Sequence, residues 1–486
     1  MATVLSTGED GGRSSSGMVG RDVVRMACDG VLLARSWAAK ASQSLETLHK
    51  LDMEDHEVGS TRGVALSDCV SLYDDTKYRL QRLFSEPHGY EDGQVWLSGA
   101  LTNHRTCLDA LNDSGSSFVP KAVHNLTNVL SEALSSYALQ AHTKDKPQPR
   151  LQVDQSNSRL LVSWDASKSR ADFVVARDGS SHYQTINQAV AALSKIGGNR
   201  PQRVIIYVKA GVYRENVVIE RHLKNVMLVG DGIGKTIITS HRNVPGGTTT
   251  YSSATFGVSG DGFWARDLTF ENTAGPEKHQ AVAARVSSDH SIFYRCSFIA
   301  YQDTLFVHSL RQFYRDCLIY GTVDFIFGNA AAILQHCEIF VRRPMSHQSN
   351  MITAQGREDP NESTGISIHL SSVAPTSDLI AVKGSFRSYL GRPWKRYSRT
   401  VFLKTNIDGV IDPKGWEEWR GNFALDTLYY GEYMNLGVGA STSNRVNWPG
   451  FHVLNQPSEA YPFTVSRFIQ GESWIPMSGV PFIPGV

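Results

Sequence analysis

Three copies of one pattern decide the fold: SIFYRCSFIA (291–300), RQFYRDCLIY (311–320) and AAILQHCEIF (331–340). Their cysteines, Cys296, Cys317 and Cys337, lie 21 and 20 residues apart. Short apolar strands that recur with a period of about 20 residues, without helices between them, are typical of a solenoid in which each repeat forms one coil. The stretch therefore predicts a parallel β-helix.

Two aspartates occupy matching places after successive copies of the pattern. Asp303 follows the first copy in AYQDTLF and Asp324 follows the second in YGTVDFIF, 21 residues later. Strands in neighbouring coils lie about 4.8 Å apart, so we expect the two carboxylates to be neighbours on one face. Paired acids on a rigid scaffold are a recurring arrangement for acid–base or nucleophilic chemistry.

Two glutamines extend this face. Gln280, in KHQAVAARV, lies 22 residues before Gln302, which directly precedes Asp303. Carboxamide NH₂ groups beside carboxylates suit a reaction that builds negative charge on an oxygen, as acyl transfer does. The alternative is a polar ladder that only satisfies backbone groups at the corners of the coils. The spacing favours chemistry.

A loop further along the chain, YLGRPWKRYSR (389–399), offers a guanidinium and an indole. Arg392 beside Asp324 would keep that carboxylate ionised and oriented. The face of Trp394 suits stacking against a sugar ring. The same loop alone is equally compatible with a buried turn that contains a salt bridge.

Composition excludes several classes of function. The chain has 486 residues, 41% apolar content and a formal charge of +1, which gives no support to a general nucleic-acid or membrane-surface role. No stretch approaches the roughly 20 apolar residues of a membrane span. His279 and His308 lack metal-ligand partners at useful spacing, so we expect no metal and read them as polar or structural residues. GDGIG (230–234) lacks the Lys-Ser/Thr ending of a phosphate loop, and we expect a turn there.

The periodicity divides the chain into four parts. Residues 1–20 read as a disordered tail. Residues 21–141 carry helical apolar stripes and predict an all-α four-helix bundle. Residues 142–170 are polar and contain two prolines, as linkers do. Residues 171–486 predict an all-β domain, with one helix at 183–195 that would cap the first coil.

The cysteines leave the redox compartment open. Cys69 and Cys107 lie on different predicted helices, and a disulfide between them would clamp those helices together. Cys317 and Cys337 lie one coil apart, so a disulfide and a pair of buried thiols remain equal alternatives. Three N-x-S/T sequons would permit glycosylation of a secreted protein: Asn112, Asn125 and Asn361.

Five ordered blocks now resemble a known family. The blocks are GVYRE (211–215), KHQAVA (278–283), YQDTL (301–305), GTVDFIFGNA (321–330) and LGRPW (390–394). They look like the signature blocks of plant pectin methylesterases, and the resemblance covers about 171–486. The helical part resembles the pectin methylesterase inhibitor-like pro-region of many plant members. The resemblance implies a right-handed parallel β-helix of the pectin-lyase-like type.

The resemblance also implies catalytic roles, carried over motif by motif. Asp324 in GTVDFIFG would be the nucleophile that attacks the methyl ester of galacturonate and forms a covalent acyl-enzyme. Asp303 in YQDTL would protonate the departing methanol and then activate water. Gln302 and Gln280 would stabilise the oxyanion. Two stacked carboxylates resist joint ionisation, so with Arg392 beside Asp324 the retained proton belongs on Asp303.

Further implications concern binding, pairing and location. Thr250, Gln280, Arg392 and Trp394 would bind homogalacturonan. The family pattern also implies a Cys317–Cys337 disulfide, no metal or cofactor, a possible separate proteinaceous inhibitor as partner, and secretion to the cell wall.

The chain departs from the family pattern near its start. The first residues do not look like a secretory signal, and the inhibitor-like region contains three cysteines where two pairs are usual. The basic processing site takes the reduced form SRLL (158–161). The bundle would mask the cleft, assist folding, or be a passive appendage.

Two rival functions follow from the same pattern. A polygalacturonase also suits carboxylates about 5 Å apart, although the glutamine pair favours an oxyanion. A pectate lyase would want a calcium-binding cluster of acids that the sequence does not offer. A catalytically silent pectin-binding protein is the second rival, and the occupied catalytic positions argue against it.

Overall fold

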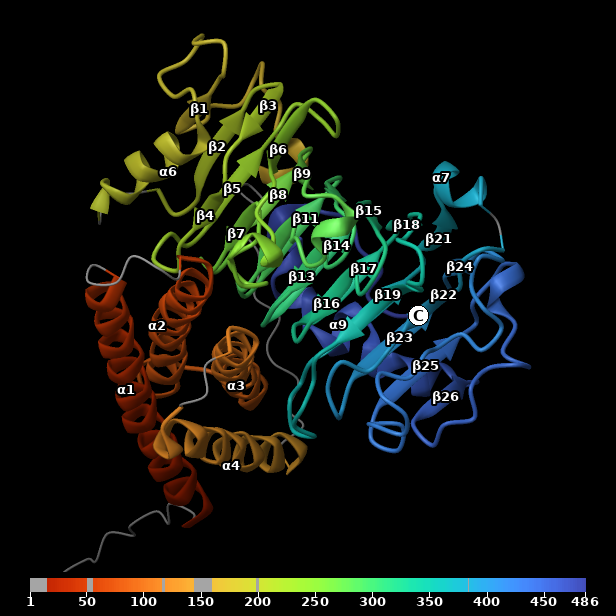
Figure 1. Cartoon of the computed structure of the whole chain (residues 1–486), viewed down its shortest axis with the longest axis horizontal. Coiled ribbons are helices and arrows are strands. Elements are labelled where there is room, and N and C mark those ends of the chain that lie inside the picture. The colour runs from red at the N-terminus through yellow and green to blue at the C-terminus, as the bar shows by residue number, and fades with distance from the viewer. Residues whose placement is uncertain (1–14, 50–55, 116–118, 144–159, 198–200, 383) are drawn as a thin grey trace, which may run out of the picture.

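The computed structural model describes residues 15–49, 56–115, 119–143, 160–197, 201–382 and 384–486. Its first part is a bundle of four helices: α1 (Ser15–His49), α2 (His56–Ser85), α3 (Tyr90–Asp113) and α4 (Lys121–Thr143). Each of α1 and α3 packs against both α2 and α4. Figure 1 shows the helices gathered on one side of the strands, with α3 nearest to them. The predicted four-helix bundle is confirmed.

Helix α1 begins earlier than the sequence pattern suggested. It starts at Ser15, so the prediction of a disordered tail is wrong for residues 15–20, and residues 1–14 lie outside the described part. The Ser/Gly-rich composition of residues 1–20 suggested disorder. The buried apolar residues that identify this helix begin only near Val23, so the sequence pattern did not show its first turns. None of the described helices is long and apolar enough to cross a membrane.

A disulfide joins two helices of the bundle. Cys69 of α2 and Cys107 of α3 are bonded, and both are fully buried among apolar side chains. The predicted clamp is therefore present. Cys28 of α1 is half-buried and free.

The second part is a right-handed parallel β-helix of three sheets, and every strand pairing among its described residues is parallel. The first sheet runs β1 (Phe173–Val175), β2 (Val204–Val208), β5 (Val226–Val229), β8 (Trp264–Arg266), β11 (Ser291–Tyr294), β14 (Arg311–Arg315), β17 (Ala331–Gln335), β20 (Gly365–His369), β23 (Arg399–Leu403), β25 (Tyr429–Tyr433) and β26 (Phe451–Leu454). The second runs β22 (Ser388–Gly391), β19 (Asn350–Gln355), β16 (Ile326–Gly328), β13 (Leu305–Val307), β10 (Ala284–Val286), β7 (Phe256–Val258) and β4 (Val217–Ile219). The third runs β24 (Asn406–Ile407), β21 (Ser372–Pro375), β18 (Glu338–Val341), β15 (Leu318–Gly321), β12 (Ser297–Ile299), β9 (Thr269–Asn272), β6 (Thr236–Ser240) and β3 (Gly211–Arg214).

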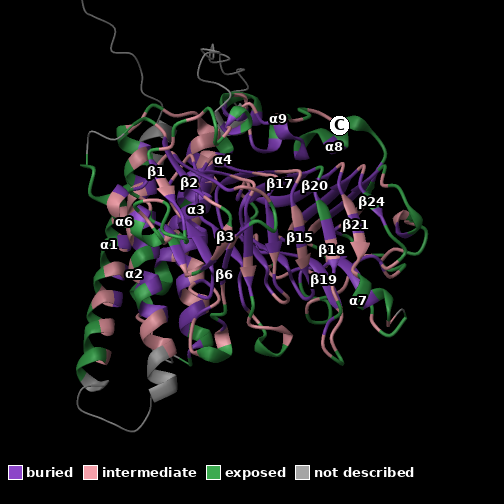
Figure 2. Cartoon of the chain, turned by 90° about the horizontal axis from the view of Figure 1, so that it is seen from above, coloured by how far each residue is buried: buried purple, intermediate pink, exposed green. Residues whose placement is uncertain are grey.

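The sequence period sets the register of the coils. Phe293 lies opposite Tyr314, and Tyr314 lies opposite Leu334, so like positions of the three sequence copies stack. The rings of Phe293 and Tyr314 are stacked with centroids 5.1 Å apart. Figure 2 shows the buried residues running along the strands from coil to coil. The core is thus a set of side-chain ladders parallel to the solenoid axis.

Each coil turns a corner through one residue in the left-handed region. Arg295, Asp316 and His336 have φ angles of 50°, 53° and 54° and hold the same place in successive coils. Such φ values are uncommon for residues other than glycine, and here the parallel strands on both sides impose them. A single left-handed residue lets the chain pass from the first sheet to the third without a long loop.

Ile319 is suitable for testing the ladders. It is fully buried between Phe298 and Ile339 of the neighbouring coils. We expect Ile319→Val to lower the free energy of unfolding by about 1 kcal/mol, because it removes one buried methylene-sized group and leaves a small void. Urea unfolding measures this. The same substitution at Ile233, which is 37% exposed, should change little; an equal loss at both sites would contradict the ladder.

The structure contradicts one implication of the family resemblance, the Cys317–Cys337 disulfide. Cys317 and Cys337 are free, buried thiols, not a disulfide. They directly precede residues that pair in register, Leu318 and Glu338. In-register neighbours hold their Cβ atoms about 4.8 Å apart, whereas a disulfide needs about 3.8 Å. Each thiol instead contacts a backbone carbonyl of the preceding coil, Cys317 that of Phe293 at 3.4 Å and Cys337 that of Tyr314 at 3.6 Å.

The segment between the two parts is ordered at its end. Residues 144–159 lie outside the described part, but α5 (Leu160–Ser163) follows them. Leu161 is fully buried against the β-helix, and Arg266 Nη1 donates to the carbonyl of Leu161 at 2.6 Å. The predicted linker at 142–170 therefore stops short of its expected end.

The remaining helices are short. Helix α6 (Ile186–Ser194), capped by Thr185, packs against β1 and β4 and covers the first coil, as the sequence predicted. The C-terminal part contains α7 (Ser377–Ile380), α8 (Pro457–Ala460) and α9 (Val465–Phe468). The 3₁₀ turns are η2 (Val244–Gly246), η3 (Pro276–Lys278), η4 (Val438–Ala440), η5 (Tyr461–Phe463), η6 (Gly471–Ser473) and η7 (Ile475–Ser478).

Candidate active site

Asp303 and Asp324 lie at one corner of the β-helix, just before β13 and β16. Leu305 of β13 pairs with Ile326 of β16, an offset that matches the spacing of the two aspartates. Their φ angles, 64° and 51°, are both left-handed. Aspartate tolerates this region better than most residues do. The two carboxylates therefore project from equivalent positions of neighbouring coils.

Arg392 holds Asp324 with two hydrogen bonds. Nε donates to Oδ1 at 2.8 Å and Nη2 donates to Oδ2 at 2.7 Å. The loop after β22 places this arginine, since the backbone amide of Arg392 donates to the carbonyl of Thr353 in β19 at 3.0 Å. A bidentate guanidinium fixes both the charge and the orientation of a carboxylate.

The two carboxyl groups differ in proton affinity. Burial raises the pKa of Asp303 well above its usual value, and the charge of Asp324 raises it further while Arg392 opposes the increase. Burial also raises the pKa of Asp324, but the hydrogen bonds and the charge of Arg392 lower it. The carboxylates form a coupled pair that titrates together. The first proton is lost from Asp324, the carboxyl that the arginine contacts.

Gln280 and Gln302 lie beside this pair with their carboxamides uncommitted. The backbone amide of Ala281 donates to the carbonyl of Gln302 at 3.3 Å, which sets the two glutamines side by side in adjacent coils. Both side chains are half-buried, and in the described part of the chain neither amide group is hydrogen-bonded to protein. Free NH₂ donors beside a carboxylate pair can stabilise negative charge on an oxygen.

A cavity of about 440 Å³ contains the whole set. The cavity is lined by all seven residues that the sequence analysis predicted for catalysis or substrate binding: Thr250, Gln280, Gln302, Asp303, Asp324, Arg392 and Trp394. The bundle closes one side of the cavity with residues from the last turns of α3 and after it: Thr106, Asp109, Ala110, Asp113 and Ser114. Masking of the cleft was one of the three roles that the sequence left open for the bundle, but the sequence did not identify the α3 residues that form this wall.

Several aromatic residues of the cavity were not identified from sequence. Phe306 and Phe327 stack with ring centroids 4.3 Å apart, and the Trp394 ring meets Phe327 edge-on at 6.0 Å. Trp419 covers the guanidinium of Arg392, whose Cζ lies 4.4 Å from the ring centroid. The spacing of 21 residues between Phe306 and Phe327 is the same coil period as that of the aspartates and could have identified them.

Buried polar contacts attach the bundle to the β-helix. Asp68 of α2 accepts hydrogen bonds from the hydroxyls of Thr249 and Ser252, in the loop that carries Thr250. Arg79 of α2 is fully buried and donates to Asp261 at 2.6 Å. Because these groups lie away from water, each of them depends on its hydrogen-bond partner for the stabilisation that water would otherwise provide.

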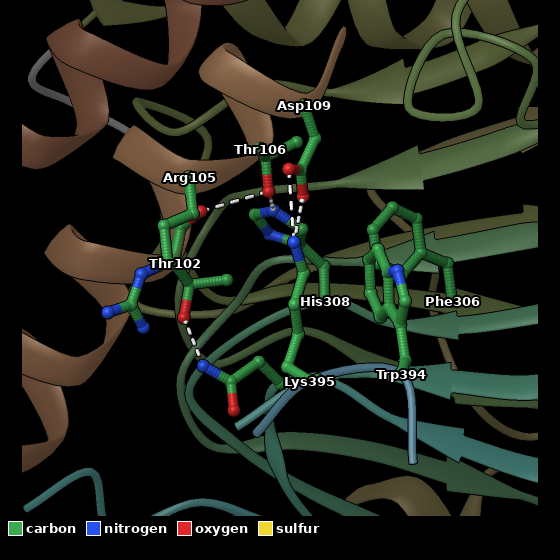
Figure 3. Close-up of a pocket in the computed structure, with 10 residues that line it drawn as sticks. Thr102, Arg105, Thr106, Asp109, Phe306, His308, Trp394 and Lys395 are labelled. Carbon is green, nitrogen blue, oxygen red and sulfur yellow. Dashed lines mark hydrogen bonds and ion pairs between the residues drawn. The ribbon is translucent and has the colours of Figure 1, made fainter. Parts of the chain in front are cut away.

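His308 is a structural residue, as the sequence suggested. Its Nε2 lies 2.9 Å from the Thr106 hydroxyl of α3, and its Nδ1 lies 3.0 Å from the Ser287 hydroxyl. Figure 3 shows it under α3, in a small pocket next to the main cavity. His279 is exposed. Within the described ranges, no group of three or more His, Cys, Asp or Glu side chains is arranged to hold a metal ion.

Family profiles match both parts of the chain. The profile described as "Pectinesterase" matches residues 172–472, and the one described as "Plant invertase/pectin methylesterase inhibitor" matches residues 12–140. The first match alone covers more than half of the chain.

Similar proteins point to the same family. A "Probable pectinesterase/pectinesterase inhibitor 36" of Arabidopsis thaliana is 57% identical, with 93% of each chain covered. "Pectinesterase 2" of Citrus sinensis is 52% identical over 87% of this chain and 82% of its own. The solved "Pectin methylesterase from Carrot" is 56% identical, covers 66% of this chain and 100% of its own, and superposes with a TM-score of 0.64. The chain therefore belongs to the pectinesterases, a family of carboxylic ester hydrolases, and carries an N-terminal domain of the plant invertase/pectin methylesterase inhibitor family.

Proposed function

We propose that the chain hydrolyses methyl esters of homogalacturonan, releasing methanol and demethylated pectin, with Asp324 as the nucleophile. The observation that carries the proposal is the asymmetric carboxyl pair, in which Arg392 binds Asp324 and burial holds a proton on Asp303. One carboxylate is prepared for attack and the neighbouring carboxylic acid for proton donation.

The acylation step uses both carboxyl groups. An Asp324 oxygen attacks the ester carbonyl, and the tetrahedral intermediate carries its negative charge on the former carbonyl oxygen. The free NH₂ groups of Gln280 and Gln302 donate to that oxygen. Asp303 passes its proton to the methoxy oxygen as the C–O bond breaks, so methanol leaves and a mixed anhydride joins Asp324 to the sugar.

The deacylation step restores the starting state. Asp303, now a carboxylate, takes a proton from a water molecule that attacks the anhydride carbonyl. The bond to Asp324 breaks, which frees the galacturonate carboxylic acid and returns Asp324 as a carboxylate under Arg392. Asp303 is left protonated for the next cycle.

The cavity walls provide the means to hold a sugar chain. Trp394, beside the stacked Phe306–Phe327 pair, offers an apolar face for a sugar ring, and Thr250 offers a hydroxyl from the facing loop. We assign binding of homogalacturonan to these residues together with Gln280 and Arg392. Residues 171–486 are the catalytic domain in this proposal, acting in the plant cell wall.

We also assign the bundle, residues 21–141, a masking role. Its α3 end lines the same cavity as the carboxyl pair, so α3 narrows the path of a polysaccharide through the cleft and should lower activity on pectin without abolishing it. A separate inhibitor protein of the same family would compete for the same face. The stretch at 142–159 would connect the two parts.

The decisive experiment is product analysis on highly esterified pectin. Methanol without new reducing ends or unsaturated sugars supports the esterase. New reducing ends would indicate a glycosidase of the polygalacturonase kind, and unsaturated products a lyase. Binding without any product would indicate a silent pectin-binding protein.

Gln302 is expected to act through the oxyanion. Gln302→Ala should lower kcat for methanol release by about 10²- to 10³-fold with a smaller change in KM, because the donor acts mainly in the transition state. Initial rates over a range of pectin concentrations measure this split. Gln184→Ala, at an exposed site outside the cavity, is the control; a rise in KM alone at Gln302 would assign it to substrate binding.

A further inference from the structure

Lys395 lies next to Trp394 and faces the bundle. Its Nζ lies 3.0 Å and 2.9 Å from the two carboxylate oxygens of Asp109, in α3. Figure 3 shows the lysine extended from the β-helix loop up to that aspartate, beside Trp394. This ion pair therefore crosses from the catalytic domain to the bundle.

Lys395 and the neighbouring Arg392 pair with carboxylates from different domains. Arg392, three residues earlier, is held by Asp324 of its own domain. Among the described residues, Asp109 is the one carboxylate within ion-pair distance of Lys395. When α3 leaves the cleft, Arg392 keeps its carboxylate and Lys395 loses its own.

The surroundings of Lys395 match the chemistry of a uronic acid. Its ammonium lies 5.3 Å from the centroid of the Trp394 ring, so one site presents an apolar ring face and a cation together. A galacturonate unit presents a C–H face and a carboxylate in the same way. A methyl-esterified unit has the C–H face but lacks the charge.

We propose that Lys395 is a binding site for the free carboxylate of an already demethylated galacturonate, and that Asp109 of the bundle occupies this site as a mimic. The inference rests on the proposed function, since it takes homogalacturonan as the ligand. The lysine would favour a substrate in which a free acid lies near the scissile ester. Removal of methyl groups would then improve the binding of the same chain.

The ion pair has the properties of a replaceable contact. The side chains of Lys395 and Asp109 are 20% and 38% exposed. Pairs at this exposure change an equilibrium constant by about fivefold or less, so a ligand carboxylate can exchange with Asp109 without unfolding either domain. The fixed pairs that attach the bundle are more deeply buried, as Arg79 and Asp261 show.

The test uses the full chain and two monosaccharide probes, galacturonate and its methyl ester. Lys395 lines the small pocket beside the 440 Å³ cavity, and its neighbours Asp109 and Trp394 line both, so a monosaccharide in the cavity lies next to the lysine. Asp109→Asn preserves the side-chain shape and releases the lysine. It should tighten galacturonate binding by about three- to fivefold, the reverse of a surface ion pair, and leave the methyl ester unchanged. Calorimetric titration at low salt measures both affinities.

Second substitutions at the lysine decide the assignment. In the Asp109→Asn background, Lys395→Gln should abolish the gain and Lys395→Arg should retain it. Lys235→Gln, at an exposed lysine outside the cavity, is the matched control. Equal affinity of the Asp109→Asn protein and the unsubstituted chain for galacturonate overturns the inference, as does a Lys395→Gln effect that is equal for acid and ester.

The same proteins separate this inference from the proposed function. Methanol release from esterified pectin is measured for each variant in parallel. If methanol is released but substitution of Lys395 does not change galacturonate binding, the inference is wrong and the proposed function stands. Carboxylate binding at Lys395 without methanol release removes the esterase and leaves a site for demethylated pectin.

Discussion

Asp324→Asn is expected to lower methanol release from esterified pectin by about 10⁴-fold or more, the size of effect seen when an enzyme loses a central catalytic group. The amide that replaces the carboxylate has no negative oxygen with which to attack the ester. Its shape is unchanged, and its remaining oxygen can still accept from Arg392, so binding of pectin and the fold should persist. Methanol assay, with urea unfolding of the same sample, measures both properties.

A matched aspartate provides the control. Asp316 also occupies a left-handed corner, with φ 53°, and pairs with Arg315 at 3.0 Å, but it lies outside the cavity. Asp316→Asn should leave methanol release within about twofold, as surface substitutions usually do. Substantial turnover in Asp324→Asn would assign the nucleophile elsewhere in the cleft. Equal losses in the two variants would indicate a general weakening of the coil.

The solenoid and its acidic pair were predictable because both depend on the length of the sequence repeat. The period of about 21 residues sets the strand register, and the same register places Asp303 and Asp324 at one corner. Gln280 and Gln302 follow from the same spacing. Local repetition in the sequence is converted directly into neighbours in space, so no long-range information was needed.

Other features depend on contacts that no period encodes. The position of α3 over the cleft depends on pairs such as Asn329 with Thr102, which are 227 residues apart. Trp419 reaches Arg392 from an irregular loop. The pairing of Cys69 with Cys107 came from the helical stripes, whereas the pairing implied for Cys317 and Cys337 failed because in-register stacking does not give disulfide geometry.

Parallel strands on both sides of the corner keep Asp303 and Asp324 in the left-handed region although both carboxyls are buried. Asp303 and Asp324 have exposed fractions of 7% and 6%, so neither carboxyl is well solvated. The surrounding coils hold them there through parallel strands on both sides, which replace the local preference of the chain. A rigid corner fixes the distance between the two carboxyls, and Arg392 then decides which of them is ionised.

Asp303→Asn is expected to lower kcat by about 10²- to 10⁴-fold, the contribution of a positioned general acid and base. The direction of the pH dependence follows from the two raised pKa values. In the proposed mechanism the active form has Asp303 protonated and Asp324 ionised, so activity should fall as the pH rises through the pKa of Asp303 and as it falls through that of Asp324. The unsubstituted chain should therefore show a bell-shaped profile of kcat/KM.

The variant should lose only one side of that profile. The amide that replaces the Asp303 carboxyl cannot titrate, so the alkaline decline disappears, while the acidic decline persists because Asp324 still ionises under Arg392. Methanol release from pectin across pH, for the two proteins in the same buffers, measures the difference. Loss of the acidic side instead would exchange the two roles and make Asp303 the group that must be ionised. An unchanged bell would show that neither limb belongs to this carboxyl, because a limb that survives removal of a group cannot report its titration.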